Sequence, residues 1–522
     1  MLPAPAHSRW DNELAGDILE AFSAFAEGVV APLDEIGDRE GARLENGRVR
    51  MPEGFAAAYA QLAEMGWQGL SAPEVHGGME QGPLVAAMVS EVFSGANHAM
   101  QMVCNLVPGA VRTLLRFGSP SQQSTWIPRL AAGEVLSTMC LSEPGAGSDL
   151  SRIRTKAVRT ADDGWRIDGE KIFISGGDQD LSDDILHLVL ARTGKPEDGI
   201  RGLSLFLASR SGAGGAIRVA RIEEKLGLHA SPTCHMVFRQ RAGGAGRPRG
   251  RRARSDVHTD EPCPPRRGPA GCRPCDARAR HRLGPCRRAG AGRRPDGSDA
   301  VLANHPDVRR MLDEQRILSL GARAMVHVAL VESERADDTA LADFLTPLCK
   351  VFCTEAGIRS ADLGIQILGG YGYLNEYRVA QTWRDARITS IYEGANGIHE
   401  LATATRNLRL RDGAGPDAFE ALVERLGGDP RVAPALARWR EARAFMLASS
   451  EPATHAHAFC GLACDLFERA VFAHGRCDIR RRNREALRKG SRPPAPARSF
   501  IVVHQASGDG QGGLPVSGRP GE

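Results

Sequence analysis

The block at positions 241–298 constrains the fold of this chain more than any other feature of the sequence. It contains one Val and one Leu and no Ile, Met, Phe, Tyr or Trp, whereas Arg, Pro, Gly and Ala dominate it. Such a composition cannot bury enough apolar surface to offset the conformational entropy lost on ordering. The block is therefore excluded from any hydrophobic core, and it divides the chain into two parts that can fold.

The same block accounts for the basic charge of the chain. All 522 residues together carry a formal net charge of +4, but positions 241–300 hold 16 Arg, no Lys and only 6 acidic residues. The rest of the chain is therefore mildly acidic. Basic charge that is confined to one low-complexity block does not imply general affinity for nucleic acid or for a membrane surface. We expect neither as a partner.

Three interpretations of the block remain open. It is a disordered basic linker, a metal or nucleic-acid module, or the product of a reading-frame error in a GC-rich gene. Cys272 and Cys275 have the C-x2-C spacing of a zinc site, but a second such pair and interleaved aromatic residues are absent. Misread GC-rich codons yield Arg, Pro, Gly and Ala without Lys, and ordinary sequence returns abruptly at Leu302. These two observations favour the frame error.

Composition and cysteine usage indicate a globular protein of a reducing compartment. Apolar residues make up 42% of the chain, and no run of about 18 apolar residues is present for a transmembrane helix. Met1–Pro5 lacks the basic residues that begin a signal peptide. The 12 cysteines follow no disulfide framework. We therefore expect a cytoplasmic protein without a metal site.

Apolar periodicity predicts helices on both sides of a β region. Before position 135, Leu14, Ile18, Phe22 and Phe25 recur at the three- and four-residue spacing of a helical face. Further along, the pattern over Ala342–Leu368 predicts a long helix that ends at Gly369-Gly370. The expected boundaries are a helical domain at 1–136, a β domain at 137–240, a helical bundle at 299–412, an extra helical segment at 413–476 and a disordered tail at 477–522.

Short apolar runs between positions 137 and 240 predict a compact antiparallel β domain. Trp165–Ile167 and Lys171–Ile174 are strand-like and flank Asp168-Gly169, which predicts a hairpin turn at that dipeptide. The order helical, β, helical then gives a mainly α fold with a central β domain.

Two stretches outside the block carry candidate chemistry. Positions 138–149 contain Gly145 and Gly147 between hydroxyl residues, and such a loop lets backbone amides approach a phosphate or a ring edge. Leu150 stands where a dinucleotide fingerprint would need a third glycine, so this loop by itself favours an ordinary interdomain turn. Glu393 follows Ile391-Tyr392 and precedes a glycine. Partial desolvation there would raise its pKa and favour a base role, against the alternative of a surface glutamate.

Taken together, the strings SEPGAGSD, EKIFISGG, EKLGLHASPT, QILGGYGY and IYEG resemble the acyl-CoA dehydrogenases in order and spacing. The resemblance runs from about position 30 to about position 410, interrupted by the block, and is closest to the long branch typified by 3-methylmercaptopropionyl-CoA dehydrogenase. It implies FAD and a three-part fold: a helical N-terminal domain, a β middle domain and a C-terminal helical bundle. In the family, the region matching the block supplies one bundle helix and basic contacts to CoA and FAD. No residue here matches those contacts.

The resemblance also implies residue roles. Glu393 matches the base that takes the α-proton while a hydride leaves to flavin N5. Ser142 matches the hydroxyl at the flavin ring, and Phe173 replaces a tryptophan that covers it. His229 would lie near the thioester channel or be structural. The implied cofactor contacts are Met139, Cys140, Leu141, Ser142, Gly147, Ser148, Phe173, Ile174, Ser175, Gln366, Gly369, Gly370, Ala395 and Gly397, those at 366–370 reaching FAD of a neighbouring subunit; the implied substrate contacts are Ser148, Tyr392 and Gly394.

The function implied by the resemblance is α,β-dehydrogenation of an acyl-CoA, with electrons passing to an electron-transfer flavoprotein from a homodimer or homotetramer. Two alternatives stay open: an acyl-CoA oxidase, and a catalytically impaired remnant that lacks one bundle helix.

If the block arises from a frame error, resequencing the DNA across positions 241–298 should reveal compensating frame changes on its two sides. A clean read in one frame would refute the frame error and leave the linker and the metal module.

Overall fold

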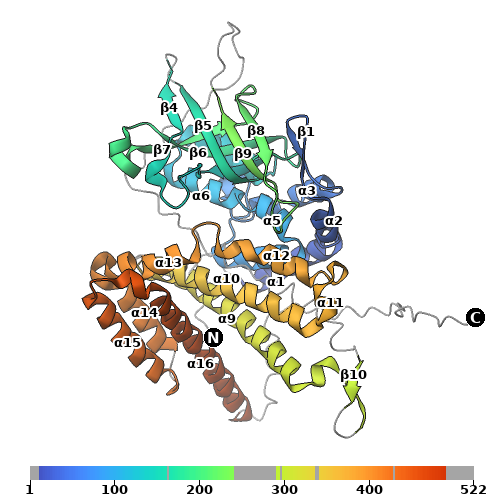
Figure 1. Ribbon diagram of the computed structural model, residues 1–522, viewed down its shortest axis with the longest axis vertical. Coiled ribbons are helices and arrows are strands. Elements are labelled where there is room, and N and C mark those ends of the chain that lie inside the picture. Colours follow the sequence, from blue (N-terminus) through green and yellow to red (C-terminus); the bar gives the residue numbers. More distant parts are fainter. Residues whose placement is uncertain are drawn as a thin grey trace, which may run out of the picture.

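The computed structural model describes residues 11–160, 164–239, 290–293, 297–335, 340–426 and 429–488. A helical N-terminal part, a β-sheet and a second helical part follow one another along the chain (Figure 1). The possible zinc ligands Cys272 and Cys275 lie outside the described residues. No described helix combines the length and apolar character needed to cross a membrane.

The N-terminal part is built mainly from helices that bury aromatic side chains. Phe22 packs edge-on against Trp67 with ring centroids 4.9 Å apart, and against Phe93 at 5.6 Å. A capping box at Ser119 and Gln122 begins the last helix. The elements are α1 Asn12–Phe25, α2 Leu33–Glu40, β1 Arg43–Glu45, β2 Arg48–Arg50, α3 Phe55–Glu64, α4 Pro83–Ala96, α5 His98–Cys104, α6 Val107–Phe117 and α7 Pro120–Ala131.

A seven-stranded sheet follows, with strand order β3-β6-β4-β5-β9-β8 and β7 paired to β6. Most pairs are antiparallel, as predicted, but β3 runs parallel to β6 over six residue pairs. One face of the sheet packs on the N-terminal helices. The strands are β3 Val135–Cys140, β4 Lys156–Arg159, β5 Trp165–Ser175, β6 Asp184–Arg192, β7 Leu203–Ser209, β8 Ile217–Ile222 and β9 Thr233–Phe238.

The hairpin predicted at Asp168-Gly169 is wrong. Both residues lie inside the continuous strand β5, whose first half pairs with β4 and whose second half pairs with β9. The glycine is needed for close approach rather than for a turn, because a Cβ at Gly169 would lie 2.4 Å from Thr155 Oγ1.

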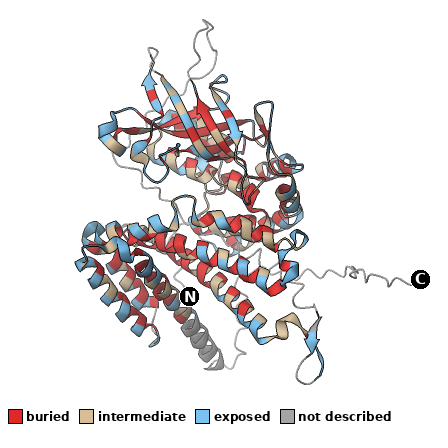
Figure 2. Cartoon of the chain, viewed as in Figure 1, coloured by how far each residue is buried: buried red, intermediate tan, exposed pale blue. Residues whose placement is uncertain are grey.

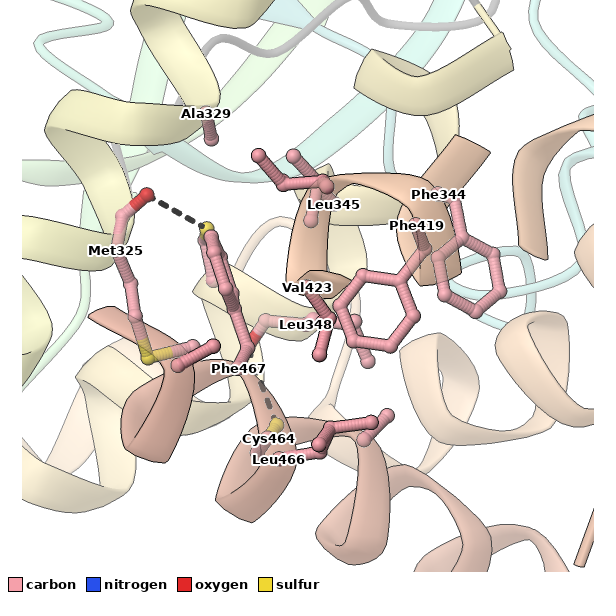
Figure 3. Close-up of a cluster of buried hydrophobic side chains, with 14 of the residues drawn as sticks. Met325, Ala329, Phe344, Leu345, Leu348, Phe419, Val423, Cys464, Leu466 and Phe467 are labelled. Carbon is pink, nitrogen blue, oxygen red and sulfur yellow. Dashed lines mark hydrogen bonds between the residues drawn. The ribbon is translucent and has the colours of Figure 1, made fainter. Parts of the chain in front are cut away.

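The C-terminal part packs around two long antiparallel helices, α9 and α10 (Figure 2). Trp439 and the rings of Phe344, Phe419 and Phe467 are fully buried between them and the last helices. Figure 3 shows part of this core, where Cys464 Sγ donates to Leu348 O at 3.6 Å. The elements are β10 Gly290–Arg293, β11 Asp299–Val301, α9 Pro306–Arg335, α10 Ala340–Leu368, α11 Gly370–Tyr373, α12 Val379–Arg387, α13 Asn396–Ala402, α14 Ala414–Leu426, α15 Ala433–Ala448 and α16 Ala456–Arg488.

Two ordered segments extend beyond the expected boundaries. The last helix, α16, continues to Arg488 rather than ending at 476, because the sequence from Cys477 to Arg488 contains good helix formers and neither Gly nor Pro. Strand β10 lies within the apolar-poor block, and among the residues that the structure describes it pairs with β11 alone, in a small two-stranded sheet.

Helix α12 joins the three parts of the fold. Its Asp385 accepts a hydrogen bond from Leu228 N at 2.7 Å, in the loop between β8 and β9. The neighbouring Arg384 donates to Asp38 on α2 through Nη1 at 3.0 Å. Arg378, immediately before α12, forms an ion pair with Asp34, which is also on α2. Asp385 and Asp34 are almost fully buried. These contacts fix the C-terminal part against both the sheet and the N-terminal helices.

Replacing Asp385 with Ala should lower the midpoint of thermal unfolding, because Leu228 N would be left buried without an acceptor at a cost of about 1–3 kcal/mol. Differential scanning calorimetry of the purified protein measures the shift of this midpoint. The matched control is Asp362→Ala, which removes an exposed carboxylate paired with Arg359 and should change stability by less than about 0.5 kcal/mol. Equal midpoints for the two variants would contradict the joining role of α12.

Candidate active site

A cleft with a volume of about 1490 Å³ lies where the three parts of the chain meet. Helices α4 and α6 form one wall, the ends of β3 and β5 form another, and α9 with the turn at 392–394 forms the third. The predicted site residues that line this cleft are Met139, Leu141, Ser142, Gly147, Phe173, Ile174, Ser175, Tyr392, Glu393 and Gly394.

The end of β5 presents an aromatic ring to the cleft. A bulge interrupts the pairing of β5 with β9 between Lys171 and Ile174, and Phe173 within it has a positive φ of 59°. A bulge redirects a side chain away from the regular alternation of a strand. Phe173 as a whole residue is consequently 64% exposed, although its neighbour Ile174 is buried.

A buried ion pair anchors the loop that follows β3. Glu143 Oε1 lies 2.7 Å from Lys171 Nζ, and Lys171 also donates to Leu141 O at 3.0 Å. Both charged side chains are almost fully buried. Burial alone would raise the pKa of Glu143, but hydrogen bonds from Lys171 and from the Thr155 and Arg154 backbone hold it below its usual value. The pair therefore fixes Leu141 and Ser142 at the cleft wall.

Glu393 lies on a tight turn at the opposite wall. Its φ is 54° and that of Gly394 is 92°, so two consecutive residues adopt the left-handed conformation. His399 Nε2 donates to Glu393 O at 3.1 Å. The sequence predicts that the Glu393 side chain is partly shielded from water. In the single chain this prediction is wrong, because the residue is exposed in the open cleft. The turn is fixed while its carboxylate faces solvent.

Several predicted residues lie away from the cleft. The Cys140 side chain points into the β core, and Ser148 is exposed on the loop after β3. Gln366 and the glycine pair at 369–370 are exposed around the end of α10, beside the exposed Tyr373. Ala395 and Gly397 are exposed, just after the turn that carries Glu393. For 366–370 the prediction is a contact with a neighbouring subunit, which a single chain does not test.

His229 has a structural position. Its ring nitrogens lie 2.9 Å from Asp38 O and 3.0 Å from Lys225 O, so it links the loop between β8 and β9 to α2. It does not line the cleft. Of the two roles considered for it, the geometry supports the structural one.

Polar residues on α4, α6 and α9 were missed by the sequence reasoning. Arg323 Nε donates to both carboxylate oxygens of Glu91, at 2.8 and 3.0 Å, across the cleft wall. Burial lowers the pKa of the nearby His327 to about 4, against the opposing effect of Glu91. Arg112 and Arg116 on α6 also line the cleft. No motif marks these residues. They could have been found only as charged side chains that interrupt mostly apolar helical patterns.

The residues present fit a flavin. An isoalloxazine ring needs a flat apolar contact and polar groups along its edge. Phe173, Met139 and Leu141 supply apolar surface, and Ser142 and Ser175 supply hydroxyls on the same wall. Ile172 N, within the bulge, donates to Ser142 O at 2.9 Å and so joins the end of β5 to the loop after β3.

Comparisons with known proteins show the family of the chain. The acyl-CoA dehydrogenase N-terminal, middle and C-terminal domain models match residues 13–134, 138–240 and 288–408. The 3-methylmercaptopropionyl-CoA dehydrogenase of Ruegeria pomeroyi is 41% identical over 415 residues, which cover 76% of this chain and 70% of that protein.

Solved structures show the same fold. Butyryl-CoA dehydrogenase from Megasphaera elsdenii matches with a TM-score of 0.64 and 22% identity, over 77% of this chain and 99% of that one. A structure of PigA with FAD and proline matches with a TM-score of 0.62 and 20% identity, over 77% and 99%. The chain belongs to the acyl-CoA dehydrogenase family, and it is a flavin-dependent oxidoreductase whose cofactor is FAD.

Proposed function

We propose that this chain converts an acyl-CoA thioester to the trans-2-enoyl-CoA, with Glu393 as the base. The observation that carries the proposal is the shared cleft. Glu393 and Gly394 form one wall, and Ser142 and Phe173 form another, although more than 200 positions separate these pairs in sequence. A carboxylate that faces a flavin-binding wall has the arrangement that dehydrogenation requires.

The reaction needs a base and a polarised carbonyl. The α-proton of a thioester is weakly acidic, and its removal creates negative charge on the thioester oxygen. The Glu393 carboxylate takes this proton, and the Glu393 backbone N–H stabilises the charge. FAD, when bound, supplies the two-electron acceptor for the β-hydrogen. The open cleft gives the carboxylate access to substrate.

The same proposal assigns the remaining contacts. Ser142 and Ser175 would bond the flavin edge, and Phe173 would cover its ring. The exposed segment Gln366–Gly370 would reach FAD of a second subunit in a homodimer or homotetramer. An electron-transfer flavoprotein in the cytoplasm would then take the electrons. The motif resemblance supports both the contact of 366–370 with a second subunit and the transfer of electrons to an electron-transfer flavoprotein.

Two alternatives have specific support. An acyl-CoA oxidase would use the same base and cofactor, and a cleft of about 1490 Å³ has room for oxygen beside the reduced ring. A catalytically impaired remnant is supported by the block at 241–298, which matches no bundle helix in composition.

Purified protein should show the absorbance of bound oxidised flavin, because the β3 and β5 wall retains its stacking and hydroxyl groups. A colourless protein that does not take up added FAD would favour the remnant. Acyl-CoA should bleach this absorbance without oxygen uptake, and uptake matching substrate consumption would favour the oxidase.

Glu393→Gln should retain flavin and lose dehydrogenation by about 10²–10⁴-fold, because the amide keeps the shape of the side chain but cannot accept the α-proton. Steady-state turnover with an artificial electron acceptor measures the loss. The control is Glu441→Gln on α15, an exposed glutamate away from the cleft, which should keep full turnover. Undiminished turnover in Glu393→Gln would exclude Glu393 as the base.

A further inference from the structure

A buried lysine lies directly beneath the turn that carries Glu393. Lys350 is in the middle of α10 and is only 6% exposed. Its Nζ donates to Gly394 O at 2.9 Å and to Asn396 Oδ1 at 2.7 Å. A buried ammonium is unfavourable unless its protons are bonded, so these two acceptors have strongly preferred positions.

One acceptor is in the left-handed turn itself, and the other lies two residues after the turn. Gly394 directly follows Glu393, and Asn396 begins α13. Asn396 Nδ2 also donates to Thr354 Oγ1 at 3.1 Å, one helical turn beyond Lys350 on α10. Because a non-glycine residue such as Glu393 rarely adopts a positive φ, the turn needs such external contacts to persist.

We propose that Lys350 is a positioning residue for Glu393. By holding the carbonyl of Gly394, its ammonium fixes the left-handed turn, and with it the direction of the carboxylate and of the Glu393 N–H. The inference rests on the proposed role of Glu393 as the base. Lys350 itself touches neither substrate nor cofactor in this scheme.

The opposite wall of the cleft uses the same device. Lys171 is fully buried and donates to Leu141 O, next to Ser142, as Lys350 donates to Gly394 O, next to Glu393. Each ammonium thus holds a main-chain carbonyl adjacent to a predicted functional residue. Two separately anchored walls would keep the distance between Glu393 and the flavin contacts constant.

The test uses Lys350→Met, which keeps the length of the side chain and removes its donors, and Asn396→Leu, which removes the second acceptor at a half-buried position. The control is Cys349→Ala, the preceding buried residue of α10, whose Sγ donates to Met325 O instead of the turn. All are measured in the full-length chain with FAD.

Lys350→Met should lower kcat by about 10- to 100-fold with KM and flavin content unchanged, since a small misplacement of a catalytic group has an effect of this size. Backbone amides of residues 391–398 should exchange with deuterium faster, with or without FAD. Asn396→Leu should show both effects more weakly, and adding it to Lys350→Met should have little further effect. Cys349→Ala should show neither.

The outcomes separate this inference from the proposed function. If Glu393→Gln is inactive while Lys350→Met keeps its kcat, the positioning role is refuted and the dehydrogenase mechanism stands. If Glu393→Gln stays active, both fail. Unchanged amide exchange at 391–398 in Lys350→Met overturns the inference even if activity is lost, because the loss would then have another origin.

Discussion

The geometry of the cleft depends on the contacts of α12. This short helix lies between the two halves of the molecule and bonds to α2 through Arg384 and to the loop between β8 and β9 through Asp385 (Figure 1). Only the short helical turn Ile388–Ser390 separates α12 from the turn that carries Glu393, so the helix that joins the parts of the fold also sets the distance of Glu393 from the sheet. Packing of the cores alone would leave this distance adjustable, whereas buried directional bonds to Asp385 restrict it.

The motifs predicted the architecture and the main walls of the site. Helical periodicity and the QILGG stop located α10 correctly, and the SEPGAGSD and EKIFIS strings identified the residues of the β wall. These successes share one cause, since the relevant side chains lie near their own main chain in short, distinctive sequences.

The failures arise where distant segments decide the outcome. Asp168-Gly169 has the local chemistry of a turn, but the approach of Thr155 and pairing on both sides keep it in a strand. From the sequence, His229 could lie in a substrate channel, but in the fold its ring contacts Asp38 O on α2. The Glu91–Arg323 pair joins helices 232 positions apart. Nothing local announces such contacts, because each depends on how two separately formed elements pack.

The bulge at Phe173 has a consequence for how the β wall tolerates changes in chain length. Side chains along a strand alternate between faces, and one extra residue against β9 is what brings this ring to the cleft. Deleting a single residue between Lys171 and Ile174 would remove the extra residue and exchange the faces of everything on one side of it. A substitution changes one side chain, whereas such a deletion would point the aromatic ring at the core and an aliphatic residue at the cleft. At this point the cleft wall is encoded by the number of residues as much as by their identity.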